Sequence, residues 1–507
     1  MPLRSRAVVD SLGADLRDAG YSADGVAAAL GEDANDALGR GIWWPALRAT
    51  RTGTATDSLS TLIRVFLLGA DVDEGEAASA FPTTGVAALV DEGVLEHRPG
   101  GRYRAILDIR PHADDVRDYL VISDQDAAMR AGPVAHDHVL GIGGASISLA
   151  RSVIRDRVDS ALDLGTGCGI QALHLDAHCT SIVATDTNPR ALALASATAR
   201  LNDMNWDLRA GSLFEPVAGE RFDLIVSNPP FVVGAGGQDY IYRDSGIVGD
   251  GLCANLIREV PDHLTSGGTA QLLANWIVRD GGDWRERVHG WLAGTGLDAW
   301  AVQRELADPI SYISLWLADA GEDPDQLAQR GSDWLDWFTD EQITGIGMGL
   351  ITLRKRRSTR GAAELPGSPS GPDQVLEEIT AAGEEVTGPE AKAFLDRRAY
   401  LRDTNDDHLL DARLATAPVF CDTQSLPGDD GWTEIGSVVR RPGGPGAVLG
   451  VDEVSRALLA GCRGEVPLRT LIELLATYHG VDADALAEAA LPMVREAIGR
   501  GILFEIG

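Results

Sequence analysis

The chain has 507 residues, which exceeds what one hydrophobic core usually organises and predicts several domains. Its 76 acidic residues outnumber its 44 lysines and arginines, and the net charge of −32 opposes broad binding to nucleic-acid backbones. No apolar segment is long enough to cross a bilayer, and no apolar leader follows Met1. A membrane protein is therefore excluded, and we expect a cytoplasmic protein.

The residue types that bind metals do not form a convincing site. The five cysteines lack C-x-x-C pairs and regular spacing, which is typical of reduced thiols; they are Cys168, Cys179, Cys253, Cys421 and Cys462. His136, Asp137 and His138 are adjacent, but neighbours in an extended segment point to opposite sides and no further ligand cluster is evident. We expect no metal and interpret this trio as a structural loop or a loop beside a cofactor.

Residues 1–115 are expected to form a helical, winged-helix-like domain. Residues 85–98, the turn at 99–101 and residues 102–108 have the pattern of a helix followed by a hairpin. Winged helices often bind nucleic acid, but this helix carries Asp91 and Glu92 and no lysine or arginine before Arg98. Protein contact or substrate presentation is therefore the expected role.

An α/β domain is expected at 116–357, and its first motif is 161–170 (ALDLGTGCGI). A short apolar strand leads there into a glycine-rich turn and a helix. Glycines permit positive φ angles and close approach of a ligand, while the helix start offers unpaired N–H groups. By itself, this pattern is weak evidence for a nucleotide site, because glycines also serve tight packing.

A second apolar strand, 181–186 (SIVATD), strengthens that interpretation. It ends in Asp186, at the carboxyl edge of the expected parallel sheet, where an acid can accept hydrogen bonds from a ribose diol. The alternative is that Asp186 caps the helix that begins near Pro189.

The most informative motif is 222–231 (FDLIVSNPPF), an apolar strand that ends in Asn228, Pro229, Pro230 and Phe231. The prolines fix φ and lack N–H donors, so the turn is rigid and the Pro229 carbonyl is left free to accept a hydrogen bond. That carbonyl and the Asn228 oxygen can hold one planar NH2 group, on which the Phe231 ring can stack. A plain strand-ending turn is the structural alternative.

Two later segments suggest a substrate side. Residues 238–246 (QDYIYRDSG) fit a lid with stacking tyrosines or an ordinary surface loop. An insertion at 306–342 carries Trp316, Trp334 and Trp337, which could wall a substrate but at helical spacing are more often packing residues. The sheet is expected to continue through 269–274, 297–302 and 348–353.

The remainder of the chain is expected to form a linker and a third domain. The basic run 354–357 (RKRR) is typical of a strand that ends in solvent, with RNA docking as the alternative. A linker at 358–373 follows. In the last domain, 374–507, residues 491–504 repeat the helix-glycine-strand pattern and predict a second winged-helix-like unit.

The motifs at 161–170, 181–186 and 222–231 together resemble class I S-adenosylmethionine-dependent methyltransferases that methylate planar nitrogens. The resemblance covers 117–355 and implies an α/β fold, a Rossmann-like class I methyltransferase sheet with flanking winged-helix-like domains. With 249–252 (GDGL), the motifs look most like release-factor glutamine methyltransferases and methyltransferase small domains. Ribosomal-RNA guanine methyltransferases and adenine-N6 enzymes share the Asn-Pro-Pro-aromatic part.

The resemblance also implies roles for individual residues. The methionine end of S-adenosyl-L-methionine is expected against Gly165, Gly167 and Gly169, its ribose on Asp186, and the acceptor nitrogen on Asn228 and Pro229. The full set of cofactor-binding residues is Asp163, Gly165, Gly167, Gly169, Asp186, Ser212, Leu213 and Asn228. The catalytic set is Asn228, Pro229, Pro230 and Phe231.

Three positions depart from the family pattern. Many relatives carry an acid where this chain has Ser212, so a hydroxyl or the backbone must contact the adenine amine. Phe231 stands where Tyr is more common and keeps the stacking surface. Residues 139–146 (VLGIGGAS) replace the proline-arginine segment of the glutamine methyltransferases, which weakens the assignment to glutamine in particular.

The chemistry requires placement of the acceptor and no general base, because the sulfonium is already activated. Asp239, Asp244 and Asp250 are therefore not assigned as catalysts. We predict N-methylation of a protein or RNA substrate of the translation machinery, with a protein glutamine favoured by 249–252 and the acidic surface, and an rRNA guanine or adenine as the alternative. A small-molecule acceptor and a non-catalytic cofactor-binding interaction module are further alternatives, the latter opposed by the intact Asn228 motif.

Overall fold

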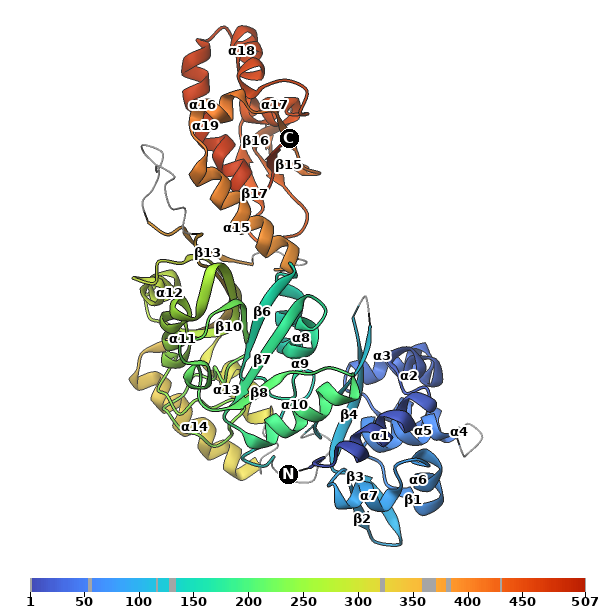
Figure 1. Cartoon of the computed structure of the whole chain (residues 1–507). Coiled ribbons are helices and arrows are strands. Elements are labelled where there is room, and N and C mark those ends of the chain that lie inside the picture. The colour runs from blue at the N-terminus through green and yellow to red at the C-terminus, as the bar shows by residue number, and fades with distance from the viewer. Residues whose placement is uncertain are drawn as a thin grey trace.

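The computed structural model describes residues 2–52, 57–114, 117–126, 134–319, 324–357, 371–379, 384–428 and 431–506. Figure 1 shows three units in chain order: a blue N-terminal unit, a central sheet with its helices, and an orange-to-red C-terminal unit. Most of the predicted linker, 358–370, lies outside the described residues. Within the described segments, no helix has both the length and the apolar character needed to cross a bilayer.

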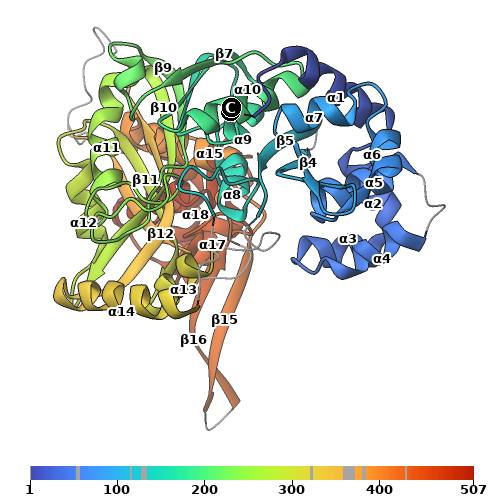
Figure 2. The same ribbon diagram turned by 90° about the horizontal axis from the view of Figure 1, so that it is seen from below.

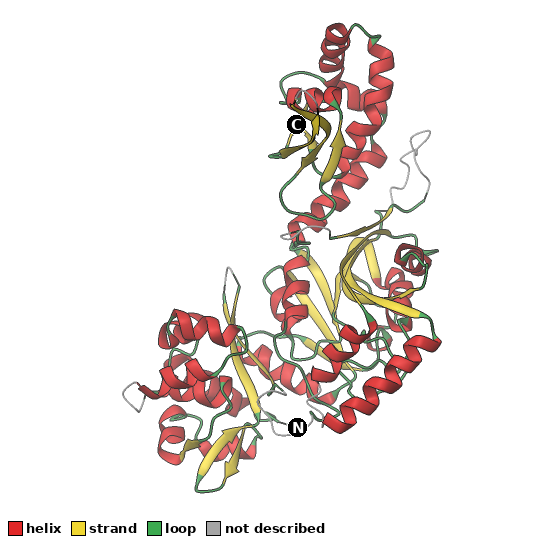
Figure 3. Cartoon of the chain, turned by 180° about the vertical axis from the view of Figure 1, so that it is seen from behind, coloured by secondary structure: helices red, strands yellow, loops and turns green. Residues whose placement is uncertain are grey.

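The N-terminal unit is mainly helical, as Figure 3 shows by colour. After α7 the chain forms the antiparallel pair β2 and β3, and β1 pairs with the other side of β3, so a helix and a hairpin occur at the predicted residues. The elements are α1 (Arg6–Asp18), α2 (Ala23–Leu30), α3 (Glu32–Gly39), α4 (Trp44–Thr52), α5 (Ser58–Leu62), η1 (Ile63–Leu67), β1 (Val72–Asp73), α6 (Glu74–Ala80), α7 (Val86–Asp91), β2 (Leu95–Arg98) and β3 (Arg102–Ala105).

A second hairpin, β4 (Leu107–Ala113) and β5 (Asp118–Asp124), joins this unit to the central domain. The backbone N–H groups of Leu120 and Ile122 donate to the side chains of Asn202 and Thr198 on α10 (Pro189–Leu201) and just beyond it. The hairpin therefore attaches the N-terminal helices to the outside of the central sheet.

The central sheet has eight strands in the order β13-β11-β12-β10-β9-β6-β7-β8. β6, β7, β8, β9 and β10 run parallel, and β12 is antiparallel to both of its neighbours. The strands are β6 (Val158–Leu164), β7 (Cys179–Asp186), β8 (Asp207–Ala210), β9 (Phe222–Ser227), β10 (Leu264–Arg279), β11 (Asp298–Ala307), β12 (Ile343–Arg354) and β13 (Gln374–Glu378). The order reverses between β6 and β9, which is where ligands bind in open α/β sheets.

Both faces of the sheet are buried, which explains its continuous apolar strands. Neighbouring residues alternate between two cores: Ala161 and Leu224 pack in one, Leu162 and Ile225 in the other. The covering helices, besides α10, are α8 (Gly144–Ser152), α9 (Ile170–Leu175), α11 (Gly251–His263) and α12 (Trp284–Leu292). The predicted α/β methyltransferase-type sheet is confirmed.

The insertion between β11 and β12 forms two helices, α13 (Pro309–Asp319) and α14 (Pro324–Asp340). Tyr312 and Phe338 are fully buried between these helices and the sheet. In Figure 2 both helices lie along one side of the central domain.

The C-terminal unit combines helices with two small sheets. α19 ends before a glycine turn, and β18 then pairs with β14, at the predicted helix-glycine-strand segment. β15 and β16 form a hairpin that projects as an arm in Figure 2. The elements are α15 (Gly388–Asp403), α16 (Asp406–Asp411), β14 (Leu414–Thr416), β15 (Phe420–Gly428), β16 (Gly431–Arg440), β17 (Val448–Val451), α17 (Glu453–Gly461), α18 (Leu468–His479), α19 (Ala483–Gly499) and β18 (Leu503–Glu505).

The basic run 354–357 is used inside the molecule. Arg354 binds Asp396 on α15, Lys355 donates to the carbonyls of Pro261 and Leu264, and Arg356 binds Asp298. Neither a free strand end nor an RNA-docking site describes these three side chains. The run instead ties the sheet to α15.

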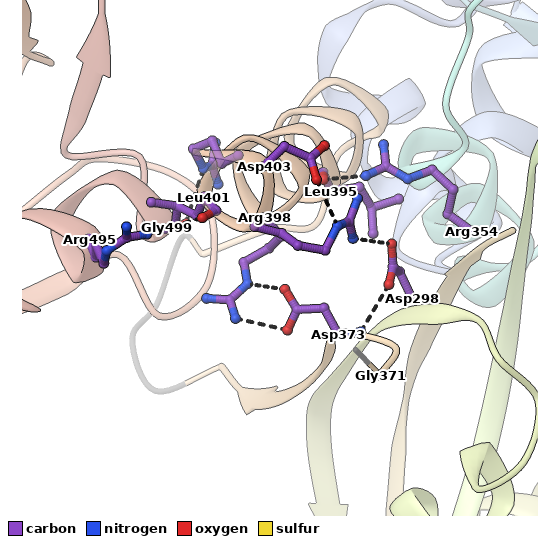
Figure 4. A network of polar contacts seen from close by, with 12 residues as sticks. Asp298, Arg354, Gly371, Asp373, Leu395, Arg398, Leu401, Asp403, Arg495 and Gly499 are labelled. Atoms are coloured by element: carbon purple, nitrogen blue, oxygen red, sulfur yellow. Dashed lines mark hydrogen bonds and ion pairs between the residues drawn. The ribbon is translucent and has the colours of Figure 1, made fainter. Parts of the chain in front are cut away.

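Asp298 is the centre of this contact between the sheet and the C-terminal unit (Figure 4). Its buried carboxylate accepts from Arg356 (2.8 Å), from Arg402 on α15 (3.0 Å) and from the Asp373 N–H (2.9 Å). Trp300 on β11 also stacks on Phe394 of α15 with ring centroids 4.2 Å apart. In addition, β13 lies beyond the predicted boundary at residue 357, yet it pairs with β11 and extends the sheet.

Replacing Asp298 with Ala is expected to destabilise the protein by about 3 kcal/mol, because it removes the buried carboxylate that two poorly exposed guanidinium groups share. Asp403→Ala is the matched control: Asp403 binds the same Arg402 but its side chain is 71% exposed, so its loss should cost less than about 1 kcal/mol. Thermal unfolding of both variants tests this. Equal melting temperatures for the two variants would contradict the central role of Asp298.

Candidate functional site

A cavity of about 290 Å³ lies at the carboxyl ends of β6, β7 and β9, where the strand order reverses. Eight residues that the sequence assigned to the site line it: Gly165, Gly167, Asp186, Ser212, Leu213, Asn228, Pro229 and Pro230. These residues come from four separate segments of the chain. Three other assigned residues, Asp163, Gly169 and Phe231, are not among the described residues that line the cavity.

The glycine-rich turn forms the floor of the cavity. The N–H groups of Gly165 and Thr166 both donate to the Thr185 carbonyl at 2.9 Å, which fastens the turn to β7. Gly165 and Gly167 have φ angles of 77° and 55°, and no atom lies within 4 Å of where a Cβ would stand. Their backbone is therefore open to a ligand on the cavity side.

Asp163 and Gly169 support this turn from behind. Asp163 is fully buried, and its Oδ2 accepts from the Thr166 hydroxyl at 2.6 Å and from the Ala172 N–H at 3.0 Å. Gly169 starts α9 with a φ of 88°, and a Cβ there would lie 2.6 Å from the Trp206 ring. Both residues were expected beside the cofactor. In the structure, Asp163 positions the turn and Gly169 packs against Trp206.

Asp186 lies beside the turn at the end of β7. Its Oδ2 accepts from the Gly167 N–H at 2.9 Å and its Oδ1 from the Asn188 N–H at 2.8 Å, while burial raises the pKa of the carboxyl above its ordinary value. The helix cap of α10 is Asn188, whose side chain accepts from the Arg190 N–H. The capping alternative for Asp186 is therefore wrong. Asn188 also lines the cavity, and the Asn-Pro signature of a helix start was the signal for it.

The acceptor end of the cavity is formed by the turn after β9. Ser227 donates to the Leu164 carbonyl at 2.8 Å, so the ends of β9 and β6 are held side by side. Asn228 follows at once, and no hydrogen bond ties its amide to another described residue. Its side chain is thus available at the cavity wall.

Phe231 packs against the insertion, and its stacking on an acceptor stays a prediction. Its half-buried ring meets Trp316 of α13 edge-on, with centroids 6.1 Å apart. Tyr242 lines the cavity instead and packs edge-on against His138, with centroids 5.8 Å apart. The sequence pointed to Tyr242 only as a candidate stacking group of the loop at 238–246.

Two segments cover the cavity. Residues 138–146 contribute His138, Val139, Leu140 and several small residues to its lining, so the trio at 136–138 belongs to a loop beside the cavity. The loop at 238–246 is fastened to that trio: the Ile241 N–H donates to the His136 carbonyl at 3.1 Å. Among the described residues, no group of three or more His, Cys, Asp or Glu side chains could hold a metal ion.

The same loop is also held by its own ion pair. Arg243 is buried, binds Asp244 at 3.0 Å and donates to the Trp316 carbonyl at 2.6 Å. Asp244 in turn accepts from the N–H groups of Asp239 and Tyr240. The loop therefore covers the cavity and is held by these contacts. It is neither a simple lid nor an ordinary surface loop.

A second chamber of about 270 Å³ adjoins the cavity and shares Asp244, Ser245 and Ile247 with it. Trp334 and Trp337 of α14 line this chamber. Val233, just after the Asn-Pro-Pro-Phe turn, donates through its N–H to the Tyr312 hydroxyl at 2.9 Å and accepts from the Trp334 indole at 3.1 Å. The insertion thus positions the Asn-Pro-Pro-Phe turn and walls the space beside it.

The acids near the motif have structural partners. Asp250 is buried, accepts from the Ile277 N–H at 2.9 Å and forms an ion pair with Arg287. The segment at 249–252 therefore starts α11 and secures it to α12. The described contacts therefore give the acids near the motif structural roles, and none of them is assigned as a base.

Comparison with known proteins gives three matching family descriptions. "Methyltransferase small domain" matches residues 142–279, which include the whole glycine turn and the Asn-Pro-Pro-Phe turn. The flanking units match "Domain of unknown function (DUF7059)" at 18–106 and "Domain of unknown function (DUF7782)" at 392–505. The flanks are thus recognised as recurring domains without an assigned role.

The curated relatives are named as methyltransferases of proteins and of RNA. A candidate protein N5-glutamine methyltransferase of Methanocaldococcus jannaschii is 30% identical over 139 residues, 26% of this chain and 70% of that protein. The release factor glutamine methyltransferase of Xylella fastidiosa is 35% identical over 157 residues, 28% and 54% of the two chains. Ribosomal RNA small subunit methyltransferase C of Erwinia tasmaniensis is 29% identical over 189 residues, 36% and 51%. The chain spans about half the length of the latter two.

The carboxyl of Asp163 predicts a measurable pH dependence of stability. Burial raises its pKa to about 7 in the folded protein, whereas an unfolded chain titrates it near 4. Between these values the folded state holds a proton that the unfolded state has lost, so stability should fall as pH rises from about 4 to about 7, by up to about 1.4 kcal/mol per pH unit.

Asp163→Asn mimics the protonated carboxyl and should flatten this part of the profile. Urea unfolding at pH 5 and pH 7.5 measures it, and Asp159→Asn at the exposed start of the same strand is the control. A wild-type profile that Asp163→Asn leaves unchanged would show that this carboxyl is ionised throughout.

Proposed function

The chain belongs to the class I S-adenosylmethionine-dependent methyltransferases with a methyltransferase small domain, and from this premise we propose that it methylates the side-chain amide nitrogen of a glutamine in a protein of the translation machinery. The observation that carries the proposal is the Asn228-Pro229 turn, which lies on the wall of the cavity next to the glycine-rich floor. We propose the cytoplasm as its place of action, as expected for a substrate of translation.

The cavity residues fit the cofactor. Gly165 and Gly167 leave backbone open to its methionine end, and the Asp186 carboxylate is suited to accept hydrogen bonds from its ribose. Ser212 and Leu213 line the same cavity, which supports the proposal that they contact the base. When bound, S-adenosyl-L-methionine supplies a methyl group that is already activated on a sulfonium.

The chain itself then has to place the acceptor nitrogen. The Asn228 oxygen and the Pro229 carbonyl can each accept a hydrogen bond from one planar NH2 group, which fixes that group in the plane they define. Held in this way, the nitrogen loses amide conjugation more easily as the new bond forms, so the two acceptors act more strongly in the transition state. The covers at 138–146 and 238–246 limit access of water.

The charges of the acceptor side favour a protein over RNA. Asp239, Asp244 and Asp333 line the second chamber, and its two arginines, Arg243 and Arg330, are ion-paired with Asp244 and Asp239. Paired arginines beside surplus carboxylates offer little attraction to a phosphate backbone. An uncharged amide on a neutral or basic polypeptide meets no such repulsion.

An rRNA guanine or adenine is the second candidate acceptor. Its exocyclic NH2 group presents the same planar pair of donors to Asn228 and Pro229, and the relative from Erwinia is named as an rRNA methyltransferase. The chemistry of the turn is therefore compatible with both acceptors, and the substrate fraction that becomes labelled separates them.

Asn228→Ala is expected to lower methyl transfer by about 100- to 1,000-fold while the affinity for S-adenosyl-L-methionine changes little, because it removes one acceptor of the transition-state NH2 group. Transfer of labelled methyl groups into an extract that lacks the endogenous enzyme measures the rate, and protease or ribonuclease treatment identifies the product. Asn205→Ala, an exposed Asn outside the cavity, is the control. Label that resists protease and yields to ribonuclease would replace glutamine with an RNA base. Absence of Asn228-dependent label in every macromolecular fraction would refute a macromolecular acceptor.

Trp334→Phe keeps an aromatic wall but removes the indole N–H that binds the Val233 carbonyl. We expect the KM for the acceptor to rise about tenfold, since the loss of one buried hydrogen bond loosens the turn that holds it. The dissociation constant of the cofactor should not change. Trp432→Phe on the distant hairpin is the control, and an equal change in cofactor affinity would assign Trp334 to the cofactor cavity.

A further inference from the structure

The N-terminal unit carries an exposed group of aromatic and basic side chains that the proposed methyl transfer does not use. Ile42, Trp43 and Trp44 are 42%, 53% and 59% exposed, although large apolar side chains usually bury most of their area. Three exposed arginines accompany them. We call this group the indole-arginine patch; it consists of Arg40, Ile42, Trp43, Trp44, Arg48 and Arg51.

The patch is held by a defined backbone. At the end of α3 the Ile42 N–H donates to the Ala37 carbonyl at 2.8 Å and the Gly41 N–H to the Leu38 carbonyl at 3.0 Å, with Gly41 at a φ of 78°. This Schellman turn leads directly into the first turn of α4. The two indoles are thus presented at a fixed corner, which Figure 1 places on the outer side of the N-terminal unit.

The other side of α4 is already packed. Ala46 is fully buried and Thr50 is nearly so, with the Thr50 hydroxyl bonded to the Ala46 carbonyl at 3.0 Å. The helix therefore has no free apolar face with which to lie in a bilayer. What remains exposed is a pair of flat rings in a segment that also carries three exposed arginines.

The net charge of the segment that carries the patch is opposite in sign to that of the whole chain. Residues 37–56 contain three arginines and no acid, within a chain that has 76 acidic and 44 basic residues. Asp36 on α3 and Asp57 before α5 mark the limits of this acid-free stretch. A polyanion that the rest of the surface repels would meet its attraction here.

We propose that the indole-arginine patch binds single-stranded RNA, with Trp43 and Trp44 stacking on bases and the arginines neutralising phosphates. Stacking on aromatic rings beside cationic side chains is how single strands are bound without base-specific hydrogen bonds. An acidic peptide would satisfy the arginines but offers no flat groups for two indoles. The proposal does not depend on the identity of the methyl acceptor, since the patch and the cavity are separate.

Fluorescence anisotropy of a labelled uridine oligomer of about twelve nucleotides, added to the full chain at about 0.15 M salt, tests the proposal. We expect saturable binding that Trp43→Ala/Trp44→Ala weakens at least about tenfold. Arg40→Gln/Arg51→Gln should also weaken binding. It should lower the slope of the logarithm of the binding constant against the logarithm of the salt concentration by the amount that corresponds to about two phosphate contacts. Trp432→Ala, which removes a 76% exposed indole at the opposite end of the chain, should leave it unchanged.

Three results would overturn the proposal. They are no binding by the wild type, equal binding by the double tryptophan variant, and equal competition by inorganic polyphosphate of matched charge, which would mean charge attraction without stacking. Binding to anionic lipid vesicles that the tryptophan variant loses, with RNA binding unaffected, would assign the patch to membranes. Circular dichroism and the rate of methyl transfer, both expected to be unchanged, show that each variant is folded.

Discussion

The parallel pairing of β6 with β9 is the constraint on which the site depends. In this register Leu164 stands opposite Ser227, and the Ser227 hydroxyl bonds the Leu164 carbonyl. The residues that follow, the glycine turn on one strand and Asn228 on the other, must then emerge at the same edge of the sheet. A shift of one residue would turn every side chain of β9 to the other face and move Asn228 from the cavity wall. One pair of strands thus brings together two motifs that lie far apart in the sequence.

The sequence made this edge predictable because each motif carries its own local signal. Apolar strands that end in glycines, in Asp186 and in Asn-Pro-Pro identify strand ends, and the carboxyl ends of parallel strands share one edge. The fold class, the strand positions and most of the cavity lining followed from that. The direction of individual side chains did not follow. Gly169 has the spacing of a cofactor contact, but Trp206, which comes after another helix, occupies the space behind it.

Contacts between distant segments explain the remaining differences. The stacking predicted for Phe231 follows from its place in the Asn-Pro-Pro-Phe motif, whereas its contact with Trp316, 85 residues later, depends on the packing of α13 on the sheet. The run at 354–357 looks like a solvent-exposed strand end, but Asp298 of the same sheet binds Arg356 and Asp396 of the third unit binds Arg354. No periodicity or local composition encodes such partners. They become visible only when the units are assembled.

Arginine has a particular role in so acidic a chain. Lys355 and Lys392 are the only lysines, so nearly every positive charge is a guanidinium, which can bind carboxylates in pairs and backbone carbonyls at the same time. Arg243 and Arg356 each bind a carboxylate and a backbone carbonyl, and Arg398 binds both oxygens of the Asp373 carboxylate, so that each arginine holds one segment against another. Arginines committed to such contacts add little positive potential outside the protein, because the paired carboxylates cancel it. An acid-free stretch with three arginines, residues 37–56, is therefore unusual in this chain, and it lies on the N-terminal unit, away from the chamber beside Asn228.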